Sequence, residues 1–323
     1  MRKALFVLLV IVVCALPAYA EDIPPAGAEK AYVESARDPD PLVRQAAAKS
    51  MGETGDKGLV VVLSGMAMGD TDEGVRVASI GALSAIGERS SLTVYEKAMS
   101  DESEKVRRSA AEALSGRWEE SSQKLLIQAL KYDKSSKVRQ AAAESLGNPG
   151  ITGRLKAHHW DGADDSEVAL IQAMKMDESF EVRATAAGIL GKFKSGKSFE
   201  PLMDAMEDKS ASVRAAAAES LGMFDKPQAV DRLLDVLFFE KDDSVIVSAL
   251  KSLKYTQDRR LIKPVIQSLK SGSSKVRWQA IDVLESLMPE EGVEPLKRIT
   301  EDRYEADGLK AKAHEALQLM GAE

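Results

Sequence analysis

The most regular feature of the chain is a pattern of apolar and small residues that returns about every 31 or 32 positions. It is clearest in DKSSKVRQAAAESLG at 133–147, DESFEVRATAAGILG at 177–191 and DKSASVRAAAAESLG at 208–222. In each, apolar residues stand just before the arginine and again eight positions later, with an alanine between them, which is helical spacing. Aligned on the arginine, nine units follow one another in steps of 32, 31, 32, 44, 31, 32, 31 and 33 residues. The residues at this position are Arg44, Arg76, Arg107, Arg139, Arg183, Arg214, Ile246, Arg277 and Lys310.

Each unit also carries signals for two helices. Four residues before the arginine position stands Asp or Ser in eight units, and such side chains cap helices by accepting free backbone N–H groups. A second amphipathic segment precedes each cap, as in QKLLIQALKY at 123–132. One antiparallel helix pair cannot cover its own apolar stripe, so the pairs must stack on one another. We therefore expect an all-α fold, a right-handed α-solenoid of about nine helix pairs that fills residues 21–323.

The repeated pattern D-x5-V-R-x2-A-A-x3-L-G resembles HEAT repeats, in particular the short subtype also found in phycobilin (PBS) lyases. The resemblance covers nearly all of the chain after residue 20. It implies an ARM/HEAT-like superhelix in which the second helix of each pair lines the concave side. It is specific for fold and says little about chemistry, because repeat scaffolds serve many functions.

The repeated arginine predicts a structural role. In the first turn of a helix it opposes the helix dipole, so something must offset its charge. In six units an acid stands six residues earlier, and we expect a ladder that joins the inter-helix loops of successive units, with an anion-binding stripe as the alternative. Its members are Asp38, Arg44, Asp70, Arg76, Asp101, Arg107, Asp133, Arg139, Asp177, Arg183, Asp208 and Arg214. In units seven and eight, Glu240 precedes Ile246 and Ser271 precedes Arg277, so each unit is expected to have lost one partner.

The step of 44 residues predicts a loop insertion at about 148–165. His158, His159 and Asp161 are weak candidates for metal ligands, because imidazole and carboxylate groups bind zinc and other divalent ions. Their spacing matches no strong metal motif. Trp160 offers a partner contact instead, and a plain surface loop is the third interpretation. We expect no cofactor.

The first twenty residues are typical of a cleaved secretory signal. Arg2 and Lys3 precede an apolar run from Ala4 to Leu16, and small residues follow. Thirteen apolar residues are too few to span a bilayer, so we expect a periplasmic or secreted protein without a stable membrane span after cleavage. Cleavage would also remove Cys14, the only cysteine. The formal charge of -7 argues against nucleic acid as a partner, since phosphate binding requires a surplus of cations.

The sequence favours a scaffold over an enzyme. It contains no phosphate loop and no nucleophile motif. Deoxyhypusine hydroxylases, which share this general build, use repeated His-Glu pairs to hold iron, and only His314-Glu315 matches that pattern. We expect a scaffold or adaptor that binds another protein or a peptide through its concave surface. The alternatives are a metal- or cofactor-dependent enzyme of lyase or hydroxylase type, which would use the insertion, and glycan binding in the concave groove.

The residue that follows each arginine position should face this concave surface. Between Ala184 and Val247 these residues are small or apolar, and Trp278 follows in the next unit. Tryptophan is enriched in interaction hot spots. The candidate partner-binding residues are therefore Trp278, Val247 and Trp160, although Trp278 could instead pack against the next unit.

Overall fold

The computed structural model describes residues 28–117, 119–148, 162–256 and 258–322, and within these ranges the chain forms helices and no strands. The helices follow one another as antiparallel pairs, one pair for each of the nine predicted repeats. The predicted all-α solenoid is therefore confirmed. The chain divides after Ser91 into two compact units.

The first unit contains the helices of repeats one and two. They are α2 (Ala28–Ser35), α3 (Pro41–Thr54), α4 (Val60–Gly69) and α5 (Glu73–Ile86), with the 3-10 turns η1 (Lys57–Leu59) and η2 (Arg89–Ser91). Helix α3 packs on α5, while α2 packs on α3 and α4 packs on α5. The core of this unit consists of buried apolar side chains such as Met51, Leu63 and Ile80.

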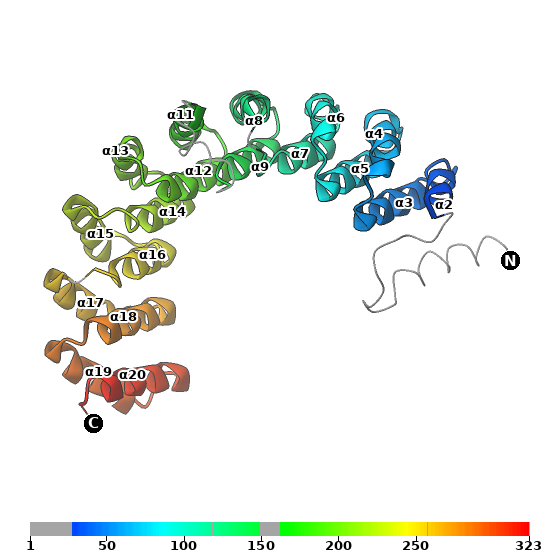
Figure 1. Cartoon of the computed structure of the whole chain (residues 1–323). Coiled ribbons are helices and arrows are strands. Elements are labelled where there is room, and N and C mark those ends of the chain that lie inside the picture. The colour runs from blue at the N-terminus through cyan, green and yellow to red at the C-terminus, as the bar shows by residue number, and fades with distance from the viewer. Residues whose placement is uncertain (1–27, 118, 149–161, 257, 323) are drawn as a thin grey trace. The chain divides into compact units, whose positions relative to one another are not determined.

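The second unit contains repeats three to nine in two layers (Figure 1). The inner layer consists of α7 (Glu104–Ala113), α9 (Ser136–Leu146), α12 (Phe180–Phe193), α14 (Ala211–Leu221), α16 (Asp243–Leu253), α18 (Ser274–Leu287) and α20 (Asp307–Leu319). Each of these helices packs on the next. The outer layer consists of α6 (Leu92–Ala98), α8 (Glu120–Tyr132), α11 (Gly162–Met176), α13 (Gly196–Ala205), α15 (Pro227–Phe239), α17 (Ile262–Ser268) and α19 (Val293–Glu301). Turns η3 (Arg259–Leu261) and η4 (Glu290–Gly292) precede the last two outer helices.

Neighbouring inner helices approach each other very closely, because small residues meet at their crossing points. A Cβ atom at Gly191 would lie 2.6 Å from the Cβ of Ser220, and one at Gly222 would lie 2.4 Å from the Cβ of Ser252. The Ser220 hydroxyl donates to the carbonyl oxygen of Ala187 on the preceding inner helix at 2.8 Å. Glycine and serine therefore let backbones approach that larger side chains would hold apart.

The helix ends follow the predicted capping signals closely. The Asp or Ser predicted as a cap is the N-cap residue in all eight helices concerned, and in five of them its side chain accepts a backbone N–H of the first turn. Ala306 is the N-cap residue of the ninth helix and has no such side chain. Most of the predicted insertion at about 148–165 lies outside the described residues, and helix α11 begins at Gly162, within its last four positions. Asp165 lies in the first turn of α11, where the helix dipole favours an acid.

Two predictions about membranes and export concern the N-terminal segment. Residues 1–20, the predicted signal, lie outside the described residues. Among the residues that are described, no helix has the length and apolar character to cross a bilayer.

Candidate functional site

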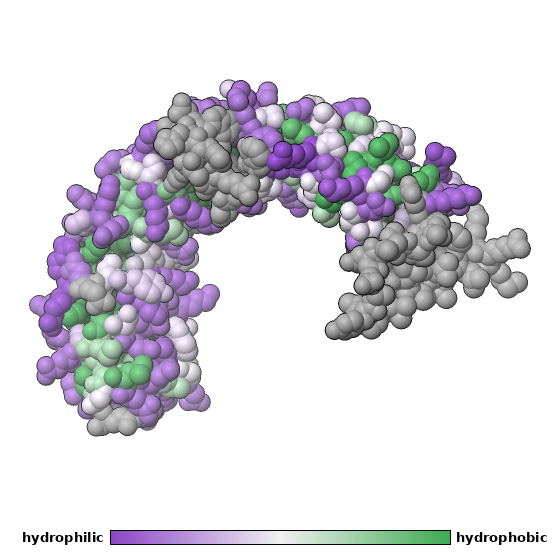
Figure 2. Space-filling view, viewed as in Figure 1, coloured by the Kyte–Doolittle hydropathy of each residue, from purple (hydrophilic) through white to green (hydrophobic). Residues whose placement is uncertain are grey.

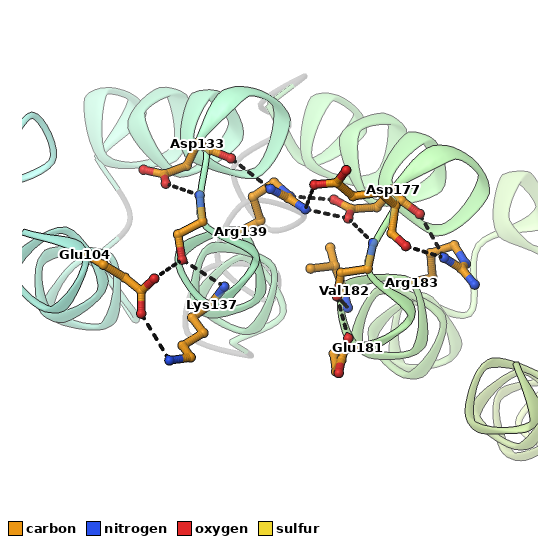
Figure 3. Close-up of polar contacts among 11 residues, drawn as sticks. Glu104, Asp133, Lys137, Arg139, Asp177, Glu181, Val182 and Arg183 are labelled. Atoms are coloured by element: carbon orange, nitrogen blue, oxygen red, sulfur yellow. Dashed lines mark hydrogen bonds and ion pairs between the residues drawn. The ribbon is translucent and has the colours of Figure 1, made fainter.

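Repeated arginines connect neighbouring repeats within each unit. The Nε and Nη2 groups of Arg139 donate to the two carboxylate oxygens of Asp177 at 2.7 and 2.8 Å (Figure 3). Its Nη1 group donates to the backbone carbonyl of Asp133 in its own repeat at 2.9 Å. Both charged side chains are buried. One planar guanidinium thus ties two inter-helix loops together, which suits the fixed fork of arginine donors.

The same bidentate geometry recurs in both units. Arg44 binds Asp70, Arg107 binds Asp133, Arg183 binds Asp208 and Arg214 binds Glu240, all with Nε–oxygen distances of 2.7 or 2.8 Å. The carboxylate therefore pairs with the arginine of the preceding repeat. The arginine six residues later in the same repeat donates instead to the backbone carbonyl oxygen of that acid, as Arg44 does to Asp38, Arg76 to Asp70 and Arg107 to Asp101.

Each ladder acid also shapes its own loop. A carboxylate oxygen of Asp133 accepts the backbone N–H of Ser135, the N-cap residue, at 2.8 Å. Hydrogen bonds donated to a carboxylate favour its charged form. The Arg44 and Arg183 guanidinium groups hold the pKa values of Asp70 and Asp208 below their usual range, and Arg214 lowers the pKa of Glu240 to about 2.

Repeats seven and eight correct one prediction. Each was expected to have lost one partner, but Glu240 is paired with Arg214, and Arg277 donates to Glu305 at 2.8 Å. Because the pairing runs from one repeat to the next, Ile246 and Ser271 are the two members of a single missing rung. Both charges are replaced together at the α16–α18 junction, so no buried charge is left without a partner there.

The inner layer carries an open track on its solvent side. Ala184, Ala215 and Val247 are half-buried, and Trp278 is 46 % exposed. A Cβ atom on Gly308 of α20 would lie 4.0 Å from the Trp278 ring, so this side chain lies close to the next repeat and also faces solvent.

A shallow groove opens beside this track. It has a volume of about 350 Å³ and lies across α9, α12 and α14. Its floor includes Ala184 and Gly188, and Glu144, Lys192 and Glu219 are among the charged residues that line it. A more apolar groove of about 550 Å³ lies between α3 and α5 in the first unit.

The predicted metal-ligand candidates belong to the insertion that follows Gly147. His158, His159, Trp160 and Asp161 lie outside the described residues. In the described part of the chain, no group of three or more His, Cys, Asp or Glu side chains could hold a metal ion. His314 is exposed on α20, where its Nε2 atom lies 3.3 Å from the side-chain nitrogen of Gln318.

The sequence analysis missed two sets of residues. Glu305 stands five residues before Lys310, whereas the other ladder acids stand six before the arginine position, so a fixed spacing overlooks it. The groove residues carry no motif, because they come from three helices of three repeats.

Comparison with known proteins agrees with this architecture. A family model described as HEAT repeats matches residues 29–115, 92–156 and 167–245. No curated protein sequence matches the chain.

Several solved structures have a similar fold. YibA of Escherichia coli is 18% identical, with a TM-score of 0.58, and the match covers 95% of this chain and 99% of that one. Yeast importin-β (Kap95p) is 15% identical, with a TM-score of 0.67, over 92% of this chain and 46% of that one. Kap95p in a complex with RanGDP is 17% identical, with a TM-score of 0.66, over 92% and 46%. The chain thus spans about half the length of these importin-β chains.

Proposed function

The chain belongs to the HEAT-repeat family, and on this premise we propose that it is a scaffold or adaptor that binds another protein or a peptide along the inner layer of its second unit. Solenoids of this fold are typically interaction proteins. Kap95p, which has a similar fold, has been crystallised with RanGDP, itself a protein. We also propose that the protein is exported, because residues 1–20 have the pattern of a secretory signal.

The observation that carries this proposal is the exposed Trp278 at one end of the open track. Ala184, Ala215 and Val247 have short apolar side chains, so a partner chain can approach the inner helices closely along the track. A large aromatic side chain beside such a surface supplies apolar contact area at little cost in conformational entropy. We assign no catalytic role, because no cluster of side chains among the described residues points to a particular reaction.

The test is affinity purification of the chain with its partners from native periplasmic extract, followed by mass spectrometry. We expect Trp278→Ala to lose a partner that the unmodified chain retains, with at least a tenfold loss of affinity when that partner is purified, as is typical of hot-spot aromatic residues. The control is Tyr255→Ala, because Tyr255 is an exposed aromatic residue that follows the C-terminal end of α16. Equal partner recovery by all three proteins would count against docking at Trp278.

Two finer predictions stay with this proposal. The HEAT match does not distinguish the short phycobilin-lyase subtype, which rests on the sequence pattern alone. A partner contact through Trp160 is likewise a proposal that rests on the sequence. Substituting Trp160 in the same purification tests it, since a scaffold that uses only the inner layer should tolerate that change.

A further inference from the structure

The groove across α9, α12 and α14 contains a glycine that helix packing does not explain. Gly188 lies inside α12, and glycine is among the least favourable residues for a helix interior. A Cβ atom at Gly188 would meet no atom within 4 Å, whereas one at Gly191 in the same helix would lie 2.6 Å from the Cβ of Ser220. Close packing therefore accounts for Gly191 and not for Gly188. The absent side chain leaves open space above the floor of the groove.

Gly188 stands at a repeat position that otherwise carries charge in the second unit. This position is the fifth residue after the arginine position, and glutamates occupy it on the two helices that flank α12. In repeat order its residues are Glu112, Glu144, Gly188, Glu219, Lys251, Asp282 and Glu315. The groove is thus a gap of one side chain between Glu144 and Glu219. The same position is glycine at Gly81 of α5, which lines the groove of the first unit.

Neither glutamate at the groove has a cationic partner within the described residues. Glu144 accepts a hydrogen bond from the side-chain amide of Gln140 at 3.1 Å, and Glu219 accepts one from the Ser248 hydroxyl at 2.9 Å. By contrast, Glu112, at the same position of α7, is paired with an arginine. Both groove glutamates are exposed, and a carboxylate can accept several hydrogen bonds. Each can therefore also accept a hydrogen bond from a bound ligand.

The charges that line the groove have a negative excess. Lys192 is the cation among the described lining residues, against two carboxylates. On the same three helices, Glu181 is a further acid without an ion pair in the described part of the chain, whereas Lys137 and the three ladder arginines are each paired with an acid. Two exposed cations, Lys194 at the C-terminal cap of α12 and Lys251 of α16, do not line the groove.

We propose that this groove binds an extended segment of the partner that carries two basic side chains with small residues between them, an inference that rests on the scaffold function proposed above. The two cations would pair with Glu144 and Glu219, and the backbone between them would lie on the floor at Ala184 and Gly188. Packed helix axes are about 8–10 Å apart, so the two glutamate positions are about 16–20 Å apart. An extended chain advances about 3.3 Å per residue, which places the basic residues about five or six positions apart.

The shape of the groove favours a peptide over a small molecule. Pockets for small ligands usually enclose most of the ligand, whereas this groove is shallow and spans three helices. Hydrophilic residues dominate the face shown in Figure 2, with smaller apolar areas among them, so recognition by charge as well as by apolar contact suits this protein. Trp278 lies on α18, two repeats beyond α14, so one partner chain can contact both places.

The test is selection from a display library of random twelve-residue peptides by the chain from Glu21 onward, the form expected after signal cleavage. We expect enrichment of peptides with two basic residues about five or six positions apart and small residues between them. The affinity of the most enriched peptide, measured by fluorescence polarisation, should weaken at high salt. Glu144→Gln and Glu219→Gln should each weaken it about two- to fivefold, the range for exposed ion pairs, and together on the order of tenfold.

Matched variants separate the groove from charge and helix propensity in general. The pair Glu112→Gln and Glu315→Gln removes the same charge at the same repeat position outside the groove, and should leave the affinity unchanged. Lys192→Gln should strengthen binding about twofold, because it removes the lining cation. Gly188→Leu should weaken binding at least tenfold and keep the melting temperature, because its side chain enters open space. Gly81→Leu, whose Cβ likewise meets no atom within 4 Å, should not change binding.

Three results would overturn the proposal. The first is no enrichment, or enrichment of peptides without basic residues. The second is an equal effect of the groove variants and their controls. The third is loss of the selected peptide by Trp278→Ala with no effect of the groove variants, because that would place the peptide at α18. In each case a Trp278-dependent partner recovered from periplasmic extract would keep the scaffold function, so the two proposals can fail separately.

Discussion

Replacing Asp133 by serine should destabilise the junction between α7 and α9 by about 3 kcal/mol or more, because it leaves the buried guanidinium of Arg107 without its carboxylate partner. The side chains of Arg107 and Asp133 are 6% and 8% exposed, and Nε and Nη2 of the arginine donate to the carboxylate at 2.8 and 3.0 Å. Removing one partner of a buried ion pair costs about 3–5 kcal/mol. Serine is the right replacement, because Ser271 shows that its hydroxyl can still accept the backbone N–H of the N-cap residue, at 3.2 Å.

The matching double variant should behave differently from the single ones. Arg107→Ile alone should cost a similar amount, since it leaves the Asp133 carboxylate without its cation. The two changes together reproduce the junction of Ile246 with Ser271, and the double variant should be no less stable than either single one. The coupling energy would then be about 3 kcal/mol, at the upper end for residues in contact. In the reverse direction, Ile246→Arg should destabilise the α16–α18 junction, and adding Ser271→Asp should restore it.

The measurement must be local, because repeat arrays can unfold in steps and a single global free energy can mix them. Native-state hydrogen exchange of the α9 amides reports the opening free energy at this junction. The control is Glu112→Gln, which removes an ion pair to Arg108 in which both side chains are 51% exposed. Such a surface pair is worth at most about 0.5 kcal/mol. Additive costs of the two single variants would refute the account of the ladder given above.

Two further predictions concern packing and pH. Gly222→Ala should lower the melting temperature by overpacking against Ser252, at a cost of about 1–3 kcal/mol, whereas Gly188→Ala, whose new Cβ meets no atom within 4 Å, should leave it unchanged or raise it. The pKa of Glu240 is lowered from 4.5 to about 2 by Arg214, so its contribution of about 3 kcal/mol is present above pH 4.5 and lost as the pH falls from 4.5 to 2. Acid titration followed by circular dichroism should show a shallower loss of stability in this window for Glu240→Gln, and an unchanged titration would contradict the assignment.

Local signals in the sequence predicted the helices well. Capping depends on residues within one turn of the helix start, so Asp40 or Ser135 predicts a boundary without knowledge of the rest of the fold. The apolar spacing likewise predicts which face of each helix is buried. The start of α11 could not be predicted equally well, because acids near Asp165 favour both a loop and a first helical turn.

The direction of the ladder lies beyond what spacing can decide. Asp177 stands six residues before Arg183, yet its carboxylate binds Arg139, 38 residues earlier. Nothing along the chain distinguishes these two partners, since the choice depends on how adjacent helix pairs are stacked. The same reason explains the groove beside Ala184, whose lining comes from three helices that only the tertiary structure brings together.

Where a rung forms, the arginine of one repeat pairs with the acid of the following repeat. The effect of deleting a repeat therefore depends on which repeat is removed. Excision of repeat six would bring Arg183 to Glu240, so a guanidinium would again meet a carboxylate. Excision of repeat seven would bring Arg214 to Ser271, which offers a hydroxyl in place of a charge. Duplications and deletions of whole repeats are therefore compatible with the ladder at some junctions and not at others, and the neutral junction marks a segment that the chain must keep.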